Sequence, residues 1–304
     1  MGFTSPSVFP HMLIERLGDA IVAWAPAKVN LHLEILAKRP DGYHEINTLL
    51  VSVSLYDTLE FRDDSSGRIH LECDQAGLST GKENLVYRAA SLLRPHNGGR
   101  GVSIRLGKRI PVAAGLAGGS SDAAATLAAL NELWRLGLST DELRALGAGL
   151  GSDVPFFFAT PAAWCTGRGE IVSSLALGRP LWFVLVCPPF GLATADVYRA
   201  VNVPADLENG MAIREAIHEG DVEKIGGRMF NRLQSAAETL CPALAKYEAE
   251  LKSAAPLGQL MSGSGTSFFA LCRDQAEAQR VALKLRTGSK EAMDSRVFIV
   301  RSCS

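Results

Sequence analysis

The chain of 304 residues has almost no net charge and no long apolar run. Its 31 Lys and Arg residues against 32 Asp and Glu residues give a formal charge of −1. Such a balance provides no bulk attraction to nucleic acid or to an anionic membrane. No apolar stretch approaches the roughly 20 residues that a membrane-spanning helix needs. We therefore expect a globular protein with neither a nucleic-acid partner nor a membrane partner.

Cysteine is scarce, and its spacing excludes the usual cysteine frameworks. The six cysteines are scattered, and no two of them form a Cys-x-x-Cys pair. This pattern favours reduced thiols over a disulfide scaffold or a zinc site. Residues 1–19 also lack the charged start and the apolar core of a signal peptide. A cytoplasmic protein without a metal site is the expectation.

The spacing of apolar residues predicts a mixed order of strands and helices. Adjacent strands dominate early and alternation dominates late, which favours an α+β fold over a doubly wound sheet. A boundary near residues 165–180 would give two domains of ordinary size, 20–170 and 171–304, after an N-terminal extension over 1–19. The expected strands are 20–38, 48–62, 68–73, 102–110, 181–187 and 296–303, with a strand–loop–strand over 257–272. The expected helices are 84–94, 121–136, 139–149, 195–201, 211–218, 222–238, 242–254 and 275–286.

A glycine-rich segment, residues 111–125, opens directly into an alanine-rich helix through Ser120 and Ser121. Glycines permit close backbone approach, and a helix N-terminus presents unpaired N–H groups with about half a positive charge. Together they predict a phosphate-binding loop. The segment has neither the lysine of a Walker A loop nor the Gly-x-Gly-x-x-Gly spacing of a dinucleotide site. The alternative is an ordinary turn in which a serine caps the helix.

Two charged residues stand in unusual places. Lys28 lies within an apolar strand, and Asn30, two residues on, points to the same face. Asp153 precedes Val-Pro-Phe-Phe-Phe, where partial exclusion of water would suit a general base. The alternatives are a lysine that reaches solvent along an edge strand and an aspartate that serves a turn.

Two further loops could contact a ligand. The turn at Pro40-Asp41-Gly42 presents Tyr43 and His44 side by side, which suits a flat group with a hydrogen-bonding edge. The Ser/Gly loop at 261–267 lies between two strand-like segments. It is either a plain hairpin or a second backbone cradle for phosphates.

These segments together resemble the GHMP kinase superfamily. Its motifs occur in the expected order: the early strand with Lys28, the loop Gly115–Ser121, and the late loop at 262–265. Residues 25–31, 39–44, 55–59 and 151–155 narrow the resemblance to the kinases that act on a cytidyl-diphosphate derivative of methylerythritol. The likeness extends over nearly the whole chain from about residue 20.

The resemblance implies a fold and a reaction. The first domain would resemble domain 2 of ribosomal protein S5, with a left-handed βαβ crossover, and the second would be ferredoxin-like. ATP, with Mg²⁺ as its counter-ion, would phosphorylate the free 2-hydroxyl of the methylerythritol part, a step in non-mevalonate isoprenoid synthesis. The only partner implied is this small molecule, and the protein would be a monomer or a weak homodimer.

The resemblance also implies roles for particular residues. Asp153 would take the hydroxyl proton, and Lys28 would hold Asp153 ionised and stabilise charge on the transferring phosphoryl group. Asn30, Tyr43, His44, Thr194 and Tyr198 would bind the substrate, the two tyrosines and the histidine at its cytosine. ATP would be held by Asn84, Leu85, Val86, Lys108, Pro111, Val112, Ala113, Ala114, Gly115, Leu116, Ala117, Gly118, Gly119, Ser120 and Ser121.

Three details stay open. Ala117 stands where the superfamily often has glycine, which a backbone cradle tolerates if φ is negative. Asp122 follows the serines, and we expect it to point aside or towards a cation. The other readings are a different GHMP kinase, such as a mevalonate or homoserine kinase, and a nucleotide sensor without catalysis.

Overall fold

The computed structural model describes residues 12–159, 161–203, 205–288 and 294–303. Backbone contacts divide them into two compact units that interleave along the chain. The first unit contains the described residues up to 27, then 55–110 and 118–159, and the second contains the rest. The chain passes between the units within two long strands, β2 (Ala20–Lys38) and β3 (His44–Asp64). The contiguous domains predicted from the sequence stay a prediction.

The first unit is built on paired strands at the start of β2 and the end of β3. β1 (Leu13–Leu17) forms an antiparallel hairpin with the start of β2. The end of β3 pairs with β5 (Gly101–Gly107), which is parallel to β4 (Ile69–Cys73). The helix α1 (Leu85–Leu93) connects β4 to β5 and completes a βαβ unit. The hand of that crossover stays a prediction.

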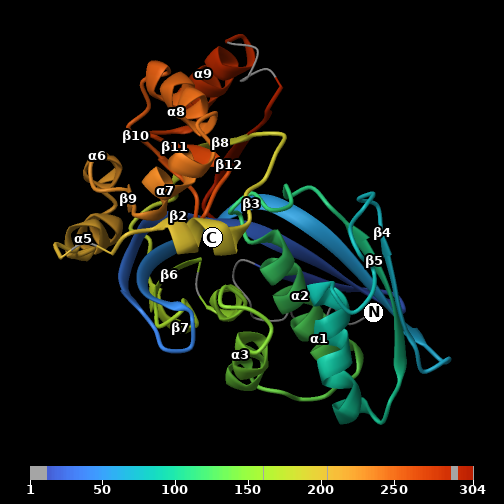
Figure 1. Cartoon of the computed structure of the whole chain (residues 1–304). Coiled ribbons are helices and arrows are strands. Elements are labelled where there is room, and N and C mark those ends of the chain that lie inside the picture. Colours follow the sequence, from blue (N-terminus) through green and yellow to red (C-terminus); the bar gives the residue numbers. More distant parts are fainter. Residues whose placement is uncertain (1–11, 160, 204, 289–293, 304) are drawn as a thin grey trace. The chain divides into compact units, whose positions relative to one another are not determined.

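The central helix of the first unit, α2 (Gly118–Leu133), is buried on nearly every side. Alanines at 123–125, 128 and 129 are all buried, and with Leu127 and Leu130 they make most of the helix surface apolar, as in a helix that lies in an interior. α1 packs along α2, and α3 (Thr140–Ala148) follows (Figure 1). α3 begins with the predicted capping box, in which Ser139 and Glu142 satisfy each other's backbone N–H groups.

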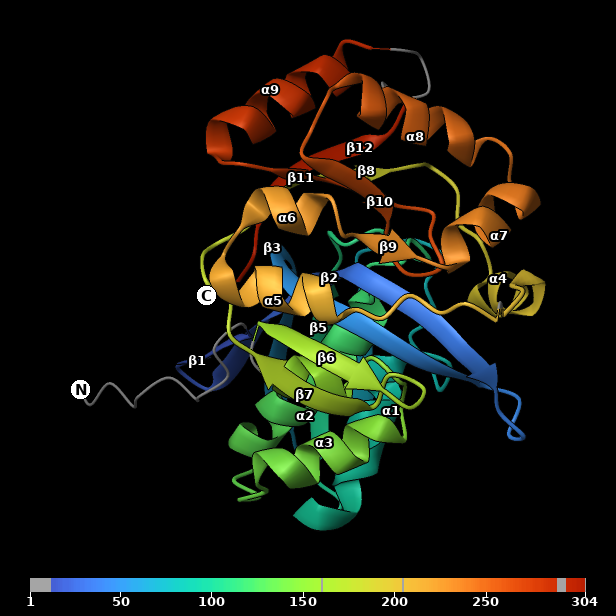
Figure 2. The same ribbon diagram turned by 90° about the vertical axis from the view of Figure 1, so that its left-hand side faces the viewer.

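The second unit contains a four-stranded antiparallel sheet in the order β10-β11-β8-β12. In chain order these strands are the second, third, first and fourth, with helices before β10 and after β11. This is the βαββαβ arrangement of a ferredoxin-like unit, as predicted. Helices α8 and α9 cover one face of the sheet (Figure 2). The elements are β8 (Trp182–Cys187), α7 (Leu233–Leu240), α8 (Leu244–Ser253), β10 (Gly258–Met261), β11 (Phe268–Cys272), α9 (Gln275–Arg286) and β12 (Arg296–Arg301).

The remaining elements of the second unit include strands that pair with the end of β2 and the start of β3. A hairpin of β6 and β7 adds to β3 in antiparallel register, and β9 adds to β2 in parallel register. These elements are β6 (Ala162–Thr166), β7 (Ile171–Leu175), α4 (Thr194–Ala200), α5 (Met211–Glu219), α6 (Val222–Gly226) and β9 (Phe230–Asn231).

The α+β class is confirmed, but some predicted elements are wrong. The single helix expected over 222–238 is α6, then β9, then α7, because the chain leaves the helix at Gly226 and Gly227. Strands β1, β6 and β7 were not predicted. α2 begins three residues earlier than expected, so Ser120 and Ser121 lie inside its first turn rather than capping it.

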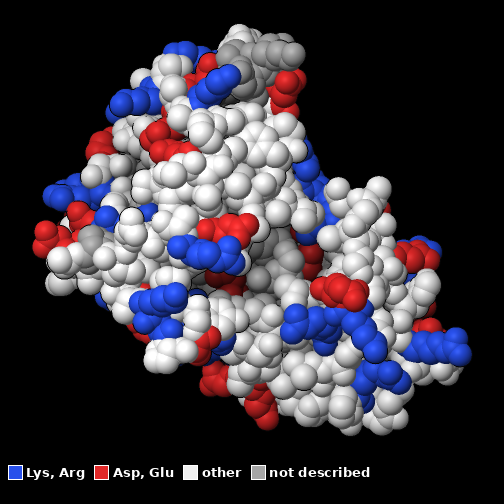
Figure 3. Space-filling model, viewed as in Figure 1, with Lys and Arg blue, Asp and Glu red and all other residues white. Residues whose placement is uncertain are grey.

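Charged side chains of both signs are interspersed in small groups on the face shown in Figure 3. This dispersal agrees with the formal charge of −1. Across the described ranges, no helix has both the length and the apolar character needed to cross a membrane.

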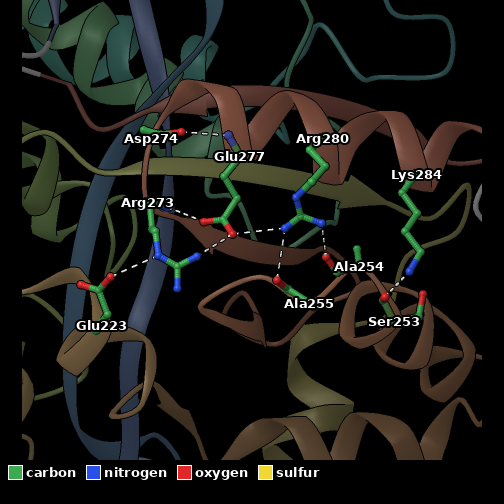
Figure 4. A network of polar contacts seen from close by, with 9 residues as sticks. All are labelled: Glu223, Ser253, Ala254, Ala255, Arg273, Asp274, Glu277, Arg280 and Lys284. Atoms are coloured by element: carbon green, nitrogen blue, oxygen red, sulfur yellow. Dashed lines mark hydrogen bonds and ion pairs between the residues drawn. The ribbon is translucent and has the colours of Figure 1, made fainter.

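A polar network ties α9 to its neighbours in the second unit (Figure 4). Asp274 caps α9 by accepting a hydrogen bond from the Glu277 backbone N–H at 2.8 Å. The Glu277 carboxylate in turn accepts hydrogen bonds from Arg273 and Arg280, and Arg280 donates to the Ala254 carbonyl at the end of α8. The cap is local and specific, whereas the outermost ion pair, Arg273 with Glu223, is exposed.

We expect Asp274→Ala to lower the free energy of unfolding of the second unit by about 1 kcal/mol, because α9 loses its N-cap. Glu223→Ala removes only an exposed ion pair and should cost less than about 0.5 kcal/mol. Chemical denaturation followed by circular dichroism measures both. Equal losses in the two variants would contradict the assigned importance of the cap.

Candidate active site

Lys28 is buried in the second unit and is held by oxygen acceptors. Its side chain lies within β2, and the residue is 3% exposed. Nζ donates to Asn30 Oδ1 at 2.6 Å and to the Gly115 carbonyl at 2.7 Å. Asn30 donates onward from Nδ2 to Thr48 Oγ1 on β3. The lysine therefore does not reach bulk solvent along an edge, and its ammonium group is fixed beside the glycine-rich loop.

The same face of β2 continues with His32 and Glu34, because side chains alternate along a strand. Glu34 is fully buried and makes a bidentate pair with Arg232. Burial raises the pKa of Glu34, but the hydrogen bonds from Arg232 and from two backbone N–H groups together have a larger, opposite effect. The pKa of Glu34 therefore lies below its usual value. This pair attaches the segment before α7 to β2.

The backbone of the glycine-rich loop has an unusual alternation. Every second residue from 113 to 117 has a positive φ: Ala113 at 52°, Gly115 at 74° and Ala117 at 55°. Such alternation turns successive N–H groups towards one side and forms an anion-binding nest. A backbone cradle was expected to tolerate alanine at position 117 only with a negative φ, and the φ of Ala117 is positive instead. An alanine occupies a conformation that glycine adopts more readily, at a cost of roughly 1–2 kcal/mol.

The Ser/Gly loop at 261–267 packs directly on the glycine-rich loop. Ser262 Oγ donates to the Gly115 carbonyl at 3.0 Å, and the Ser267 N–H donates to the Ala114 carbonyl at 3.2 Å. Asn231 holds the Ser/Gly loop through two hydrogen bonds, because its Nδ2 donates to the carbonyls of Met261 and Gly263. The segment is a hairpin connection that also braces the first loop.

The predicted cytosine-binding residues lie together in the second unit. The rings of His44 and Tyr198 have their centroids 5.4 Å apart, and the Arg168 guanidinium lies 4.7 Å above the Tyr43 ring. Burial, and then the charge of Lys38, lower the pKa of His44 below its usual value. A neutral imidazole has one donor and one acceptor. Thr194 lies on the same helix as Tyr198 and shares a 2.9 Å hydrogen bond with Ser264.

In the first unit, the start of α2 contains a buried ionic cluster. Lys108 Nζ contacts Asp57 and lies 2.8 Å from Asp122 Oδ2. Burial raises the pKa of Asp122 to about 7, an effect that Lys108 opposes and Asp57 reinforces. Burial lowers the pKa of Lys108, but the two carboxylates outweigh it and leave the value above normal. Asp122 points to a cation, as expected.

Asp153 also belongs to the first unit and lies in a turn closed by the Val154 N–H and the Gly151 carbonyl. Gly151 lies close to Ser120 in the first turn of α2, since a Cβ on it would stand 3.7 Å from Ser120 Oγ. Asn84 caps α1 as predicted, and Leu85 lies against Gly119. The turn with Asp153 and the start of α2 are thus neighbours.

The sequence therefore indicated members of three polar clusters, those around Lys28 and His44 in the second unit and that around Lys108 in the first. Several other members of these clusters were not predicted. Arg168, Thr48 and Asn231 had no distinguishing motif. Asp57 lies in β3 and is buried. A charged residue within a strand of largely apolar residues was the signal that could have found it. The catalytic and binding roles of all the named residues stay predictions.

Comparisons with known proteins give the family. Residues 84–160 match the family model for the GHMP kinases N terminal domain, and 213–290 match that for the GHMP kinases C terminal. A 4-diphosphocytidyl-2-C-methyl-D-erythritol kinase of Pelotomaculum thermopropionicum is 46% identical over 91% of this chain and 98% of its own length. This chain is a GHMP kinase of the 4-diphosphocytidyl-2-C-methyl-D-erythritol kinase family.

Solved structures agree with membership of the GHMP kinases. A crystal structure of 4-(cytidine 5'-diphospho)-2C-methyl-D-erythritol kinase is 39% identical, with a TM-score of 0.78 over 93% of this chain and 99% of that one. The homoserine kinase of Cytophaga hutchinsonii is 19% identical with a TM-score of 0.73 over 95% and 96% of the two chains. At 19% identity, this likeness to the homoserine kinase concerns the fold alone.

We expect Gly115→Ala to destabilise the second unit by at least about 2 kcal/mol, since the new Cβ would collide with the Ser262 carbonyl at a positive φ. Gly119→Ala is the matched control, because its Cβ would make an ordinary 3.6 Å contact with Leu85 inside a helix. Thermal unfolding of the two variants checks this. A similar melting temperature for both would contradict the close packing of the two loops.

Proposed function

We propose that this protein transfers the γ-phosphoryl group of ATP to the 2-hydroxyl of 4-diphosphocytidyl-2-C-methyl-D-erythritol. The observation that carries the proposal is the 46% identity to a kinase of that name over nearly its whole length. The clusters described above supply side chains suited to each part of such a reaction. The activity belongs to the non-mevalonate synthesis of isoprenoid precursors and would be cytoplasmic.

The loop from Pro111 to Ser121 would hold the triphosphate. Its alternating positive φ angles support this role, because they turn N–H groups rather than side chains towards an anion. Ser121 Oγ is buried without a hydrogen-bond partner among the described residues, so a phosphate oxygen would satisfy it. The absence of a Walker lysine is then no obstacle, since backbone N–H groups and Lys28 supply the positive field.

Asp153 would accept the proton of the substrate hydroxyl while the hydroxyl oxygen attacks the γ-phosphorus. The bond between the γ-phosphorus and the oxygen that it shares with the β-phosphate would break, and ADP would leave. Lys28 would stabilise negative charge on the transferring group, and its two oxygen acceptors keep its ammonium in place. Phosphoryl transfer depends mainly on such positioning and electrostatics. The roles of both residues rest on the resemblance of their segments to the family.

On the acceptor side, Tyr43 and Tyr198 would stack on the cytosine, and His44 would read its hydrogen-bonding edge. The lowered pKa of His44 supports this role, because a neutral imidazole can donate at one nitrogen and accept at the other. Asn30 and Thr194 would contact the erythritol–diphosphate part. Specificity against a simple alcohol such as mevalonate would come from this cytosine pocket.

Magnesium would arrive as the counter-ion of ATP. Among the described residues, no three His, Cys, Asp or Glu side chains are grouped so that they could hold a metal ion. Mg²⁺ is commonly bound by substrate phosphates and water with only one or two protein ligands. A site formed mainly by the triphosphate fits this chain, and we keep the proposal of a monomer or weak homodimer.

A coupled assay of ADP release tests the proposed function directly. We expect turnover with the cytidyl-diphosphate substrate and at most about a hundredth of that kcat/KM with mevalonate or homoserine, which lack the base that Tyr43 and His44 would bind. Preferred turnover of either simple alcohol would instead indicate another GHMP kinase. Nucleotide binding without turnover of any alcohol would indicate a sensor.

We expect Asp153→Asn to lower kcat at least about a hundredfold while ATP affinity stays near that of the wild type, because the amide cannot take the hydroxyl proton. Asp141→Asn, at an exposed position of α3, is the control and should leave kcat unchanged. Steady-state kinetics and equilibrium nucleotide binding are the measurements. An unaltered rate in Asp153→Asn would remove this residue as the base.

A further inference from the structure

The ionic cluster of the first unit lies between the two ends of the glycine-rich loop. We propose that Asp57, Lys108 and Asp122 form a positioning triad that fixes both ends of this loop and so keeps it ready for the nucleotide. The inference rests on the proposed binding of ATP by the loop. None of the three residues is proposed to touch the reacting atoms.

The triad is almost completely removed from water. The exposed fractions of the side chains are 0% for Asp57, 4% for Lys108 and 3% for Asp122. Lys108 Nζ contacts Asp57 Oδ2 and lies 2.8 Å from Asp122 Oδ2, so a single ammonium group bridges the two carboxylates. Its positive charge is therefore already matched inside the protein.

Asp57 anchors the point where the chain enters the loop. Its second oxygen, Oδ1, accepts hydrogen bonds from the N–H groups of Arg109 at 2.6 Å and Ile110 at 2.9 Å. These are the last two residues before Pro111, at which the loop begins. The Lys108 N–H is held as well, by Asp74 Oδ1 at 2.8 Å. Three successive backbone groups before the loop are thus bound to carboxylates.

Asp122 anchors the point where the loop ends in α2. It lies in the first turns of the helix, just after Gly118, Gly119 and the two serines. Gly118 independently shows how closely the two ends meet. A Cβ on this glycine would stand 2.9 Å from Ile110 Cγ2 and 3.2 Å from Lys108 Nζ. The entry and the exit of the loop are therefore packed against each other with no room for a methyl group.

A buried charge set of this kind is sensitive to the loss of any one member. Removing a partner leaves the remaining charge desolvated and incompletely matched, which is far more costly than breaking an exposed pair. Asp122 Oδ1 already lacks a hydrogen-bond partner among the described residues. Neutral asparagine has the same shape and can still accept from Lys108, so it is the conservative replacement at this position.

The test compares Asp122→Ala with Asp122→Asn in the full-length enzyme. We expect Asp122→Ala to raise the KM for ATP about tenfold and to change the KM for the cytidyl substrate by less than about twofold. Asp122→Asn should recover the KM for ATP to within about threefold of the wild type. A purely structural role would instead lower kcat through a smaller active fraction and leave both KM values unchanged.

Hydrogen exchange of the backbone amides at 113–117 provides a readout that does not depend on catalysis. These amides should exchange faster in Asp122→Ala than in the wild type, in Asp122→Asn or in the surface control Asp19→Ala, whose side chain is 81% exposed. Unchanged exchange together with an unchanged KM for ATP would overturn the triad as a positioning device. If the wild type binds no ATP, the proposed function fails, and the exchange rates alone then decide whether the triad holds the loop.

Discussion

Each unit buries a lysine, and a buried ammonium group is tolerable only beside acceptors that stay in place. Lys28 finds them in Asn30 and the Gly115 carbonyl, and Lys108 finds them in Asp57 and Asp122. Both arrangements involve the glycine-rich loop or the residues that flank it. The loop contains two alanines at positive φ, and the Ser/Gly loop packs on it at Gly115. Local strain and buried charge are therefore concentrated in and beside the segment that we propose holds the nucleotide.

Features that depend on a few neighbouring residues could be predicted from the sequence. The Asn84 cap of α1, the capping box of α3 and the exact span of α9 follow from side chains within one helical turn. The buried strand at 182–187 follows from its uninterrupted apolar residues. Lys28 stood out because its charge occurs among apolar residues, and Asp122 because it follows the two serines at the start of a helix. For such positions, elementary chemistry predicted that a partner exists, although not which residue it is.

Features that depend on distant parts of the chain could not be predicted. The periodicity over 222–238 is helical, yet α6 ends at Gly226, and Asn231 lies in β9, where its side chain donates to the carbonyls of Met261 and Gly263. The hairpin of β6 and β7 is specified by its pairing with β3 rather than by its own short sequence. Asp57 and Lys108 are 51 residues apart, and they meet because β3, which contains Asp57, pairs with β5, which ends one residue before Lys108. The interleaving of the two units has no local signal at all.

The parallel pairing of β2 with β9 joins residues 32 and 33 to residues 230 and 231. During synthesis, the strand that contains Lys28 leaves the ribosome long before its partners at 231 and 262 exist. At about 5–20 residues per second, that interval is on the order of 10–50 seconds. Throughout it, a long apolar strand has an unpaired edge and its lysine lacks the support of the later loop. The architecture therefore creates a period of exposure to chaperones and to aggregation that a chain with contiguous units would shorten.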